Sequence, residues 1–352
     1  MSETSGEDLR KQPRFSQEEA EQILFQSFGI LGRGSTLPSE RDQNFCMKTE
    51  QQTYILKIAN PETQLSQLEL ENSAIRLCEA CSFLSPRLVR AETSRWIESV
   101  LDANGTSHSI RCLEFVPGVP LAAIENADAD LFRAIGRALA EMDLALAHLN
   151  HNTGVRRELK WDLKNAPAII RGTIEQLKNP DQQRWLEKVL SNFQTIEDRI
   201  EGLPHSVIHN DANDYNVIVG PADELDEWKV GFIDFGDMMW ATTVNELAIC
   251  LAYLMLDRRD PIGTGVAFVA GYDQLRPLSE GELSVLFPLA CMRLGQSVCI
   301  ARQQQLVMPD NEYLNVTETP AWRLIESLVE LDPEEVRFKF ASVCQLEHRP
   351  RL

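Results

Sequence analysis

The sequence predicts an α+β protein with two lobes, and three observations support this. Short strand-like runs are concentrated in the first third of the 352-residue chain, after residue 29. The second half carries apolar residues mainly at three- and four-residue spacing, which is typical of helices. Pro117 and Gly118 break the chain between these parts. We therefore expect an N-terminal lobe of residues 1–116 and a C-terminal lobe of residues 117–352.

The first lobe is expected to begin with an amphipathic helix at residues 15–28. Ser16 followed by Glu19 forms a capping box, which marks a helix start. A second helix is predicted at residues 65–81, where apolar residues return at helical spacing. Apolar runs bounded by turn-forming residues predict the strands of a small antiparallel sheet. These runs are 45–48, 54–58, 95–101 and 109–115.

The second lobe is expected to be mainly helical. Four stretches have helical spacing: residues 130–148, 181–200, 245–256 and 280–304. Three short apolar runs interrupt them and predict strands: residues 207–208, 217–219 and 229–233. Loops that carry carboxylates follow the first and third of these runs, and catalytic groups are often found on such loops.

Composition excludes several classes of protein. The chain has 53 acidic and 34 basic side chains, for a net charge of -19, whereas binding to nucleic acid needs clustered Lys and Arg. The longest apolar run, residues 247–256, is short of the ~20 residues that cross a bilayer, so no membrane partner is expected. Residues 1–14 lack the apolar segment of a signal peptide. The eight cysteines are expected to be thiols of the core and not metal ligands. Together these features predict a cytoplasmic protein.

Two motifs carry the chemistry. The first is His-Asn-Asp-Ala-Asn-Asp-Tyr-Asn at residues 209–216, and the second is Asp-Phe-Gly at residues 234–236. In kinases, the Asp of H-x-D-x-x-x-x-N orients the attacking hydroxyl, while the Asn and the Asp of D-F-G bind magnesium. An amide oxygen and a carboxylate, completed by phosphate and water, suit the octahedral shell of Mg²⁺. Either motif alone is common by chance. Both in this order predict kinase chemistry, with Asp211 as the catalytic residue and Asn216 and Asp234 as metal ligands.

Further residues are expected to bind the nucleotide. Lys57 lies on an otherwise apolar strand, where the phosphate-binding lysine of kinases is found. Glu71 is the preferred partner for it, because its position on the helix faces inward, whereas Glu69 is expected to face solvent. Gly34 and Ser35 fall where a phosphate-covering turn between the first two strands should be. This signal is weak, since no G-x-G-x-x-G is present, and a plain hairpin turn explains it equally well.

With these residues, the chain resembles the aminoglycoside phosphotransferase superfamily over about residues 15–340. Its nearest likeness there is to the hydroxylysine kinases and to a phosphotransferase module that some bacterial proteins carry ahead of a class III aminotransferase-like domain. Besides the two motifs, the likeness rests on four segments: residues 37–45, 159–163, 271–272 and 276–278. The resemblance implies a bilobal protein-kinase-like fold that binds ATP or GTP in its cleft. A hinge with Glu114 and Val116 would meet the nucleobase.

The chain departs from this family and from protein kinases at two points. Many family members have Gly where Asn210 stands, between the His and the Asp of the motif; Asn tolerates unusual backbone angles, so we expect activity to survive. After the Asp-Phe-Gly motif no Ala-Pro-Glu element appears, and a helix is predicted from residue 245. This leaves no room for a segment that positions a peptide. A small-molecule acceptor is therefore favoured.

The acceptor site is expected to draw on five residues: Trp161, Asp162, Asp237, Trp240 and Arg293. Gln296, on the same predicted helix as Arg293, is a further candidate. Asp162 and Asp237 could hold an amine and Arg293 a carboxylate, which suits an amino acid or amino alcohol. Each of the five also has an ordinary structural interpretation, as a core tryptophan or as half of a surface ion pair.

The function predicted is that of a magnesium-dependent kinase acting on the hydroxyl of a small amine or amino acid. Hydroxylysine or a related amino alcohol is the leading acceptor. One alternative is an aminoglycoside or other antibiotic phosphotransferase, and another is a non-catalytic nucleotide-binding module resembling a pseudokinase. The resemblance also implies a functional link to a pyridoxal-phosphate-dependent phospholyase or aminotransferase.

Overall fold

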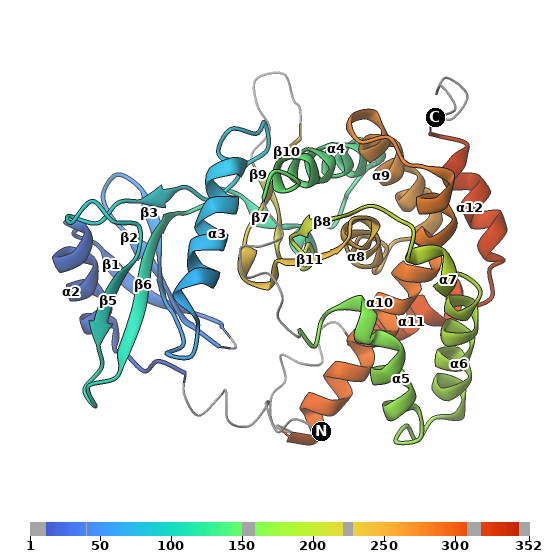
Figure 1. The fold of residues 1–352 in the computed structure, drawn as a ribbon, viewed down its shortest axis with the longest axis horizontal. Coiled ribbons are helices and arrows are strands. Elements are labelled where there is room, and N and C mark those ends of the chain that lie inside the picture. The colour runs from blue at the N-terminus through green and yellow to red at the C-terminus, as the bar shows by residue number, and fades with distance from the viewer. Residues whose placement is uncertain (1–11, 40, 150–158, 221–227, 308–317, 345–352) are drawn as a thin grey trace. The chain divides into compact units, whose positions relative to one another are not determined.

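A computed structural model describes residues 12–39, 41–149, 159–220, 228–307 and 318–344 (Figure 1). The chain forms two compact units. The first contains the residues up to Ala80 together with Leu84–Pro117. The second contains Cys81–Phe83 and the chain from Gly118 onward. The break between the units thus falls after Pro117, one residue beyond the expected end of the first lobe.

The first unit is built on an antiparallel sheet with the strand order β1-β2-β3-β6-β4, and β5 also pairs with β6. The strands are β1 (Arg33–Leu37), β2 (Gln43–Lys48), β3 (Thr53–Ile58), β4 (Leu88–Val89), β5 (Glu98–Leu101) and β6 (Ser107–Glu114). Strand β3 lies between β2 and β6, so both of its edges are hydrogen-bonded. This central position gives its side chains fixed directions.

Two helices cover opposite faces of this sheet. Helix α2 (Gln17–Phe28) begins with the expected capping box, in which Ser16 and Glu19 exchange side-chain and backbone hydrogen bonds. Its apolar face packs on alternate residues of β2, β3 and β6. Side chains at the intervening positions point to the other face. There Arg111 of β6 contacts Glu71 of α3 (Leu65–Cys78).

The second unit is mainly helical and is organised around one long helix. Helix α10 (Glu280–Val307) packs against α5, α6, α8, α11 and α12. Its apolar stretch is long enough to cross a membrane, but 94% of that stretch is buried inside the protein, as expected of a core helix. The other helices are α4 (Ala129–Leu146), α5 (Ala166–Ile174), α6 (Pro180–Gln194), α7 (Glu197–Ile200), α8 (Val244–Leu254), α9 (Pro261–Leu275), α11 (Glu318–Leu328) and α12 (Pro333–Ala341).

Short strands in the second unit position the two sequence motifs. Strands β7 (Val119–Pro120), β9 (Val217–Gly220) and β10 (Lys229–Phe232) form one small sheet, in the order β10-β9-β7. Strands β8 (His205–Ile208) and β11 (Met239–Thr242) pair as another. Residues 209–216 therefore connect β8 to β9, and residues 233–238 connect β10 to β11.

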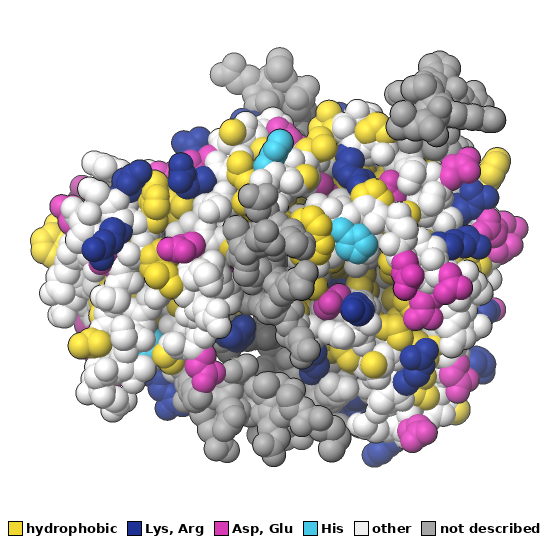
Figure 2. Space-filling model, viewed as in Figure 1, with side chains coloured by type: hydrophobic (Ala, Val, Ile, Leu, Met, Phe, Trp, Pro, Cys, Tyr) yellow, Lys and Arg dark blue, Asp and Glu magenta, His cyan; other side chains and the backbone are white. Residues whose placement is uncertain are grey.

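The mixed α+β organisation, with an antiparallel sheet followed by a helical part, is confirmed. Charged side chains of both signs are intermingled over the face drawn in Figure 2. The predicted helix at residues 181–200 is two helices, α6 and α7, because the chain turns at Thr195 and Ile196.

Candidate active site

His209 anchors the loop that carries the first motif. Its ring is fully buried, with Nε2 3.1 Å from the carbonyl of Ile233, while Nδ1 accepts the backbone N–H of Asp211. Burial lowers the pKa of His209 to about 4, so the imidazole is neutral at pH 7. Because Nδ1 accepts, the neutral ring carries its proton on Nε2, which donates to the carbonyl of Ile233. His209 thus supports the loop and connects it to the chain beside Asp234.

Asn210 has a φ of 67°, in the left-handed region where Asn is one of the better-tolerated residues. Its backbone N–H donates to Oε2 of Glu246 on α8, at 2.7 Å. The Glu246 side chain is fully buried, and burial raises its pKa well above the usual range. The Asn at this position therefore occupies the conformation for which Gly is suited in many family members.

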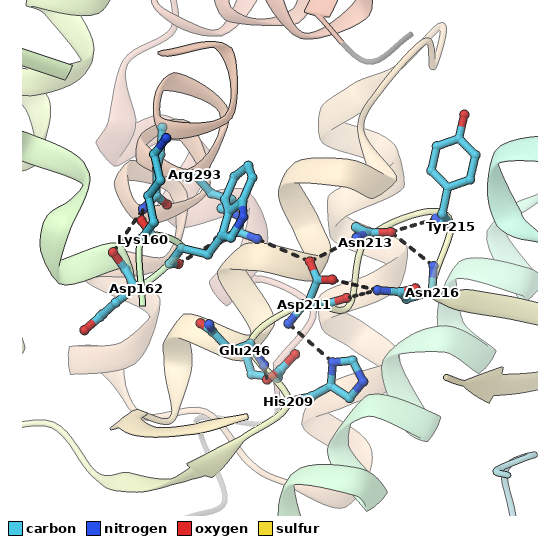
Figure 3. A network of polar contacts seen from close by, with 12 residues as sticks. Lys160, Asp162, His209, Asp211, Asn213, Tyr215, Asn216, Glu246 and Arg293 are labelled. Atoms are coloured by element: carbon cyan, nitrogen blue, oxygen red, sulfur yellow. Dashed lines mark hydrogen bonds and ion pairs between the residues drawn. The ribbon is translucent and has the colours of Figure 1, made fainter. Parts of the chain in front are cut away.

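Asp211 is held in place through both of its carboxylate oxygens (Figure 3). Oδ1 accepts from Nδ2 of Asn213 at 3.0 Å and lies 3.5 Å from Nη2 of Arg293. Oδ2 accepts from Nδ2 of Asn216 at 2.7 Å. The side chain remains 25% exposed, so a substrate oxygen could reach it. Burial and the charges of the nearby Asp237 raise the pKa of Asp211 above its ordinary range.

Asn216 and Asp234 lie on neighbouring chain segments. The N–H of Ile233, next to Asp234, donates to the carbonyl of Asn216, and Val217 pairs with Phe232 in the adjoining strands. The Asn216 amide nitrogen donates to both the backbone and the side chain of Asp211, which leaves its Oδ1 to act as an acceptor.

These oxygens fit a magnesium ion. Asp234 is exposed, with a φ of 64°, and supplies a carboxylate. Among the described residues no group of three His, Cys, Asp or Glu side chains could hold a metal. Magnesium usually takes one or two protein ligands and completes its shell with water and phosphate. A pair of ligands, one amide and one carboxylate, matches that habit. The assignment of Asn216 and Asp234 as ligands stays a prediction.

The structure brings Asp162 and Arg293 to the same network as Asp211 (Figure 3), and Arg293 also contacts Trp161. Nη1 of Arg293 donates to the carbonyl of Trp161 at 2.8 Å, and its guanidinium lies 4.6 Å from the Trp161 ring centroid. Oδ1 of Asp162 accepts the N–H of Lys164 and caps the short helix Leu163–Asn165. Burial raises the pKa of Asp162.

The other two acceptor candidates lie beyond the second motif. Asp237 ends the short helix Phe235–Asp237, close enough for its charge to raise the pKa of Asp211. Trp240 lies in β11, opposite Val207 of β8, and is half-buried. Their roles with the acceptor stay predictions.

The predicted nucleotide residues belong to the first unit. Lys57 lies in β3, directly opposite Arg111 in the register with β6, so their side chains share one face of the sheet. Glu71 is buried on α3 and accepts hydrogen bonds from Arg111 at 2.5 Å and from Gln67 at 3.3 Å. The pairing of Lys57 with Glu71 stays a prediction. Sequence reasoning missed Arg111; its position within a buried strand was the available signal.

Two other residues predicted to bind the nucleotide, Gly34 and Ser35, form part of a strand. They lie inside β1, which ends only at Leu37, so the connection to β2 comes after them. The N–H of Gly34 donates to Glu21 and its carbonyl accepts from Gln17, both on α2. This placement differs from the expectation that Gly34 and Ser35 lie in a phosphate-covering turn.

The predicted hinge follows β6. The N–H groups of Glu114 and Phe115 donate to the carbonyls of Arg87 and Thr53. Val116 is buried. The contact of this segment with a nucleobase stays a prediction.

A sheet unit followed by a helical unit, with an H-x-D-x-x-x-x-N loop beside an Asp-Phe-Gly segment, defines the class of kinase-like phosphotransferases. Residues 34–279 match the model of the phosphotransferase enzyme family, and the chain belongs to this family. It is 28% identical to hydroxylysine kinase of Mus musculus, over 95% of this chain and 96% of that protein. It is 29% identical to hydroxylysine kinase of Xenopus laevis, over 92% of each chain.

Solved structures show the same fold. An amicoumacin kinase bound to AMP-PNP, Ca²⁺ and its antibiotic superposes with a TM-score of 0.67 and 16% identity, covering 92% of this chain and 97% of that one. A microcompartment-associated aminopropanol kinase has a TM-score of 0.65 and 16% identity, with the same coverage. The family match and the hydroxylysine kinase relatives identify the protein as a small-molecule kinase that acts on a hydroxyl group. Kinase-like proteins of this family use ATP or GTP, typically with a divalent metal.

Proposed function

We propose that the protein is a magnesium-dependent kinase that transfers the γ-phosphate of ATP or GTP to the hydroxyl of a small amine or amino acid. Hydroxylysine or a related amino alcohol is the acceptor that we favour. The observation that carries the proposal is the fixed carboxylate of Asp211, which Asn213, Asn216 and Arg293 hold beside the metal motif. The names of the relatives, hydroxylysine kinase and aminopropanol kinase, support the choice of acceptor.

In this proposal the protein accelerates the reaction mainly by positioning the reactants and neutralising charge, and less by covalent chemistry. Asp211 orients the acceptor hydroxyl and takes its proton while the oxygen bonds to the γ-phosphorus and the nucleoside diphosphate leaves. Asn216 and Asp234 would hold magnesium. The metal, when bound, neutralises charge on the phosphates. Lys57 is assigned to nucleotide binding.

Two acidic residues are assigned to the acceptor amine. Asp162 and Asp237 could each pair with an ammonium group, and an acidic surface weakly favours cations. The net charge of -19 fits a cationic acceptor better than an anionic one.

Antibiotic phosphorylation is a second candidate, because the amicoumacin kinase shares the fold. A non-catalytic module is less favoured, because Lys57, Asp211, Asn216 and Asp234 are all present. We place the protein in the cytoplasm, since its eight cysteines are free thiols, as is usual in a reducing compartment. We also propose a functional link to a pyridoxal-phosphate-dependent phospholyase or aminotransferase, because a phosphorylated amine suits such an enzyme.

A substrate panel tests this function. Purified protein with magnesium and either ATP or GTP would be incubated with hydroxylysine, amino alcohols, amicoumacin and an aminoglycoside, and the release of nucleoside diphosphate would be measured. We expect turnover with the first two groups. Turnover with the antibiotics alone would replace the favoured acceptor. Nucleotide binding without any turnover would support the non-catalytic module.

A further inference from the structure

The side chain of Arg293, on helix α10, is almost completely buried in the protein, although arginine is rarely buried unless it is paired. Its side chain is 1% exposed. Nη1 donates to the carbonyl of Trp161, Nη2 lies 3.5 Å from Oδ1 of Asp211, and the guanidinium also lies over the Trp161 ring. Arg293 therefore contacts both the chain segment that carries Trp161 and the carboxylate of the catalytic loop.

Gln296 holds the same segment from the next turn of the helix. Residues three apart share one face of a helix, and the Gln296 side chain is fully buried. Its Nε2 donates to the carbonyls of Lys160 at 2.9 Å and of Asp162 at 3.0 Å. Arg293 and Gln296 thus bind three consecutive carbonyls, those of residues 160–162, which we call the 160–162 loop. These three hydrogen bonds fix the loop to α10.

The end of the loop is also ordered internally. The N–H of Asp162 donates to the carbonyl of Leu159, and Nδ2 of Asn165 donates to the same carbonyl at 2.9 Å. Oδ1 of Asp162 accepts the N–H of Lys164. The Asp162 carboxylate therefore belongs to a segment whose place is set by α10.

We propose that Arg293 is a positioning residue for the acceptor, which fixes the 160–162 loop relative to Asp211, with Gln296 as its partner on the loop. This inference rests on the proposed function. Nη1 and Nη2 of Arg293 are turned toward Trp161 and Asp211, and its Nε is buried without a partner among the described residues. With both Nη atoms engaged, Arg293 is placed to hold the loop and not to bind a substrate carboxylate. The acceptor ammonium is bound by Asp162 and the acceptor hydroxyl by Asp211. Arg293 sets the separation of these two carboxylates.

The proposal specifies which groups the acceptor must carry. An amine and a hydroxyl at a suitable distance satisfy both carboxylates, and a carboxylate on the acceptor is not needed. Amino alcohols are therefore acceptors of the same kind as hydroxylated amino acids.

Steady-state kinetics of two variants, with hydroxylysine and 1-amino-2-propanol as acceptors, test the role. Arg293→Lys keeps the charge but loses the planar fork. We expect its kcat to fall about 100-fold and its acceptor KM to rise, because a misplaced acceptor reacts slowly. Gln296→Met frees the loop without touching Asp211. We expect its acceptor KM to rise about tenfold with little change in kcat. The nucleotide Kd of both should stay within about twofold of wild type.

Arg302→Lys, on the same helix, is the control and should behave as wild type. If the wild type turns over while both variants match its acceptor kinetics, the role of Arg293 is overturned and the proposed function stands. Equal losses of acceptor and nucleotide binding would mark general damage and also overturn the role. If the wild type phosphorylates no acceptor, the proposed function fails, and this role with it. Should Arg293→Lys not fold, Gln296→Met carries the test.

Discussion

The backbone N–H of Asn210 donates a hydrogen bond to the buried carboxylate of Glu246, and the two atoms are 2.7 Å apart. This bond connects the loop of the first motif to α8. It also holds Asn210 at its φ of 67°, where a side chain with a branched Cβ is strained. The direction in which Asp211 points therefore depends on one residue in a left-handed conformation.

The backbone of Asn210 can be tested by two substitutions. We expect Asn210→Val to lower the free energy of unfolding by about 2 kcal/mol, since a β-branched residue is strained at positive φ. Asn210→Gly should stay within about 1 kcal/mol of wild type, because Gly adopts this conformation freely. Urea unfolding measures both. Equal losses for Val and Gly would show that the Asn side chain matters more than the backbone angle.

Asp143 should make stability depend on pH. Burial raises its pKa to about 7, and its Oδ2 accepts a hydrogen bond from Tyr272. A carboxyl with a raised pKa in the folded state gives stability that is fully present below its unfolded pKa and is lost as the pH rises through about 7. Asp143→Asn removes this titration and keeps an acceptor for Tyr272.

We therefore expect the stability of wild type relative to Asp143→Asn to fall by about 2 kcal/mol between pH 5 and pH 8. Denaturant unfolding at a series of pH values measures the difference. A difference that is constant over this range would mean that Asp143 does not titrate there.

The choice of Glu71 over Glu69 has a matched test on α3. Glu71→Gln leaves the buried Arg111 without its counter-charge, and breaking a buried pair costs about 3 kcal/mol. We also expect the KM for nucleotide to rise, because Glu71 is proposed to orient Lys57. Glu69 is exposed, so Glu69→Gln should change neither quantity. A nucleotide KM that responds equally to both substitutions would remove the special role of Glu71.

Local signals allowed much of the fold to be predicted. The capping box at Ser16 and Glu19 marked the start of α2 because cap bonds are made within one turn. Helix α9 was missed because Gly263, Gly265 and Gly271 make its sequence a poor helix former. Gly271 is needed there, since a Cβ at this position would meet the carbonyl of Arg133 at 2.0 Å. The packing between helices therefore requires Gly at this position, and this requirement cannot be read from local helix propensity.

The candidate site likewise has residues that the sequence predicted and contacts that it could not predict. Asp211, Asn216 and Asp234 were proposed from motif spacing, because their geometry is made by two short loops. The contacts of Arg293 with Trp161 and Asp211 join residues 132 and 82 positions apart in the chain, and no local pattern specifies them. The same holds for Arg111 and Glu71, which are 40 positions apart.

Replacement of Asp211 by Asn tests the central claim most directly. The amide keeps the shape of the side chain and removes the group that is proposed to accept the hydroxyl proton. Turnover of the best acceptor with magnesium and nucleotide should fall by about 1,000-fold, in the range that general-base catalysis supplies. Nucleotide affinity should be nearly unchanged. An Asp211→Asn protein that turns over as fast as wild type would contradict the assignment of Asp211 and the kinase mechanism built on it.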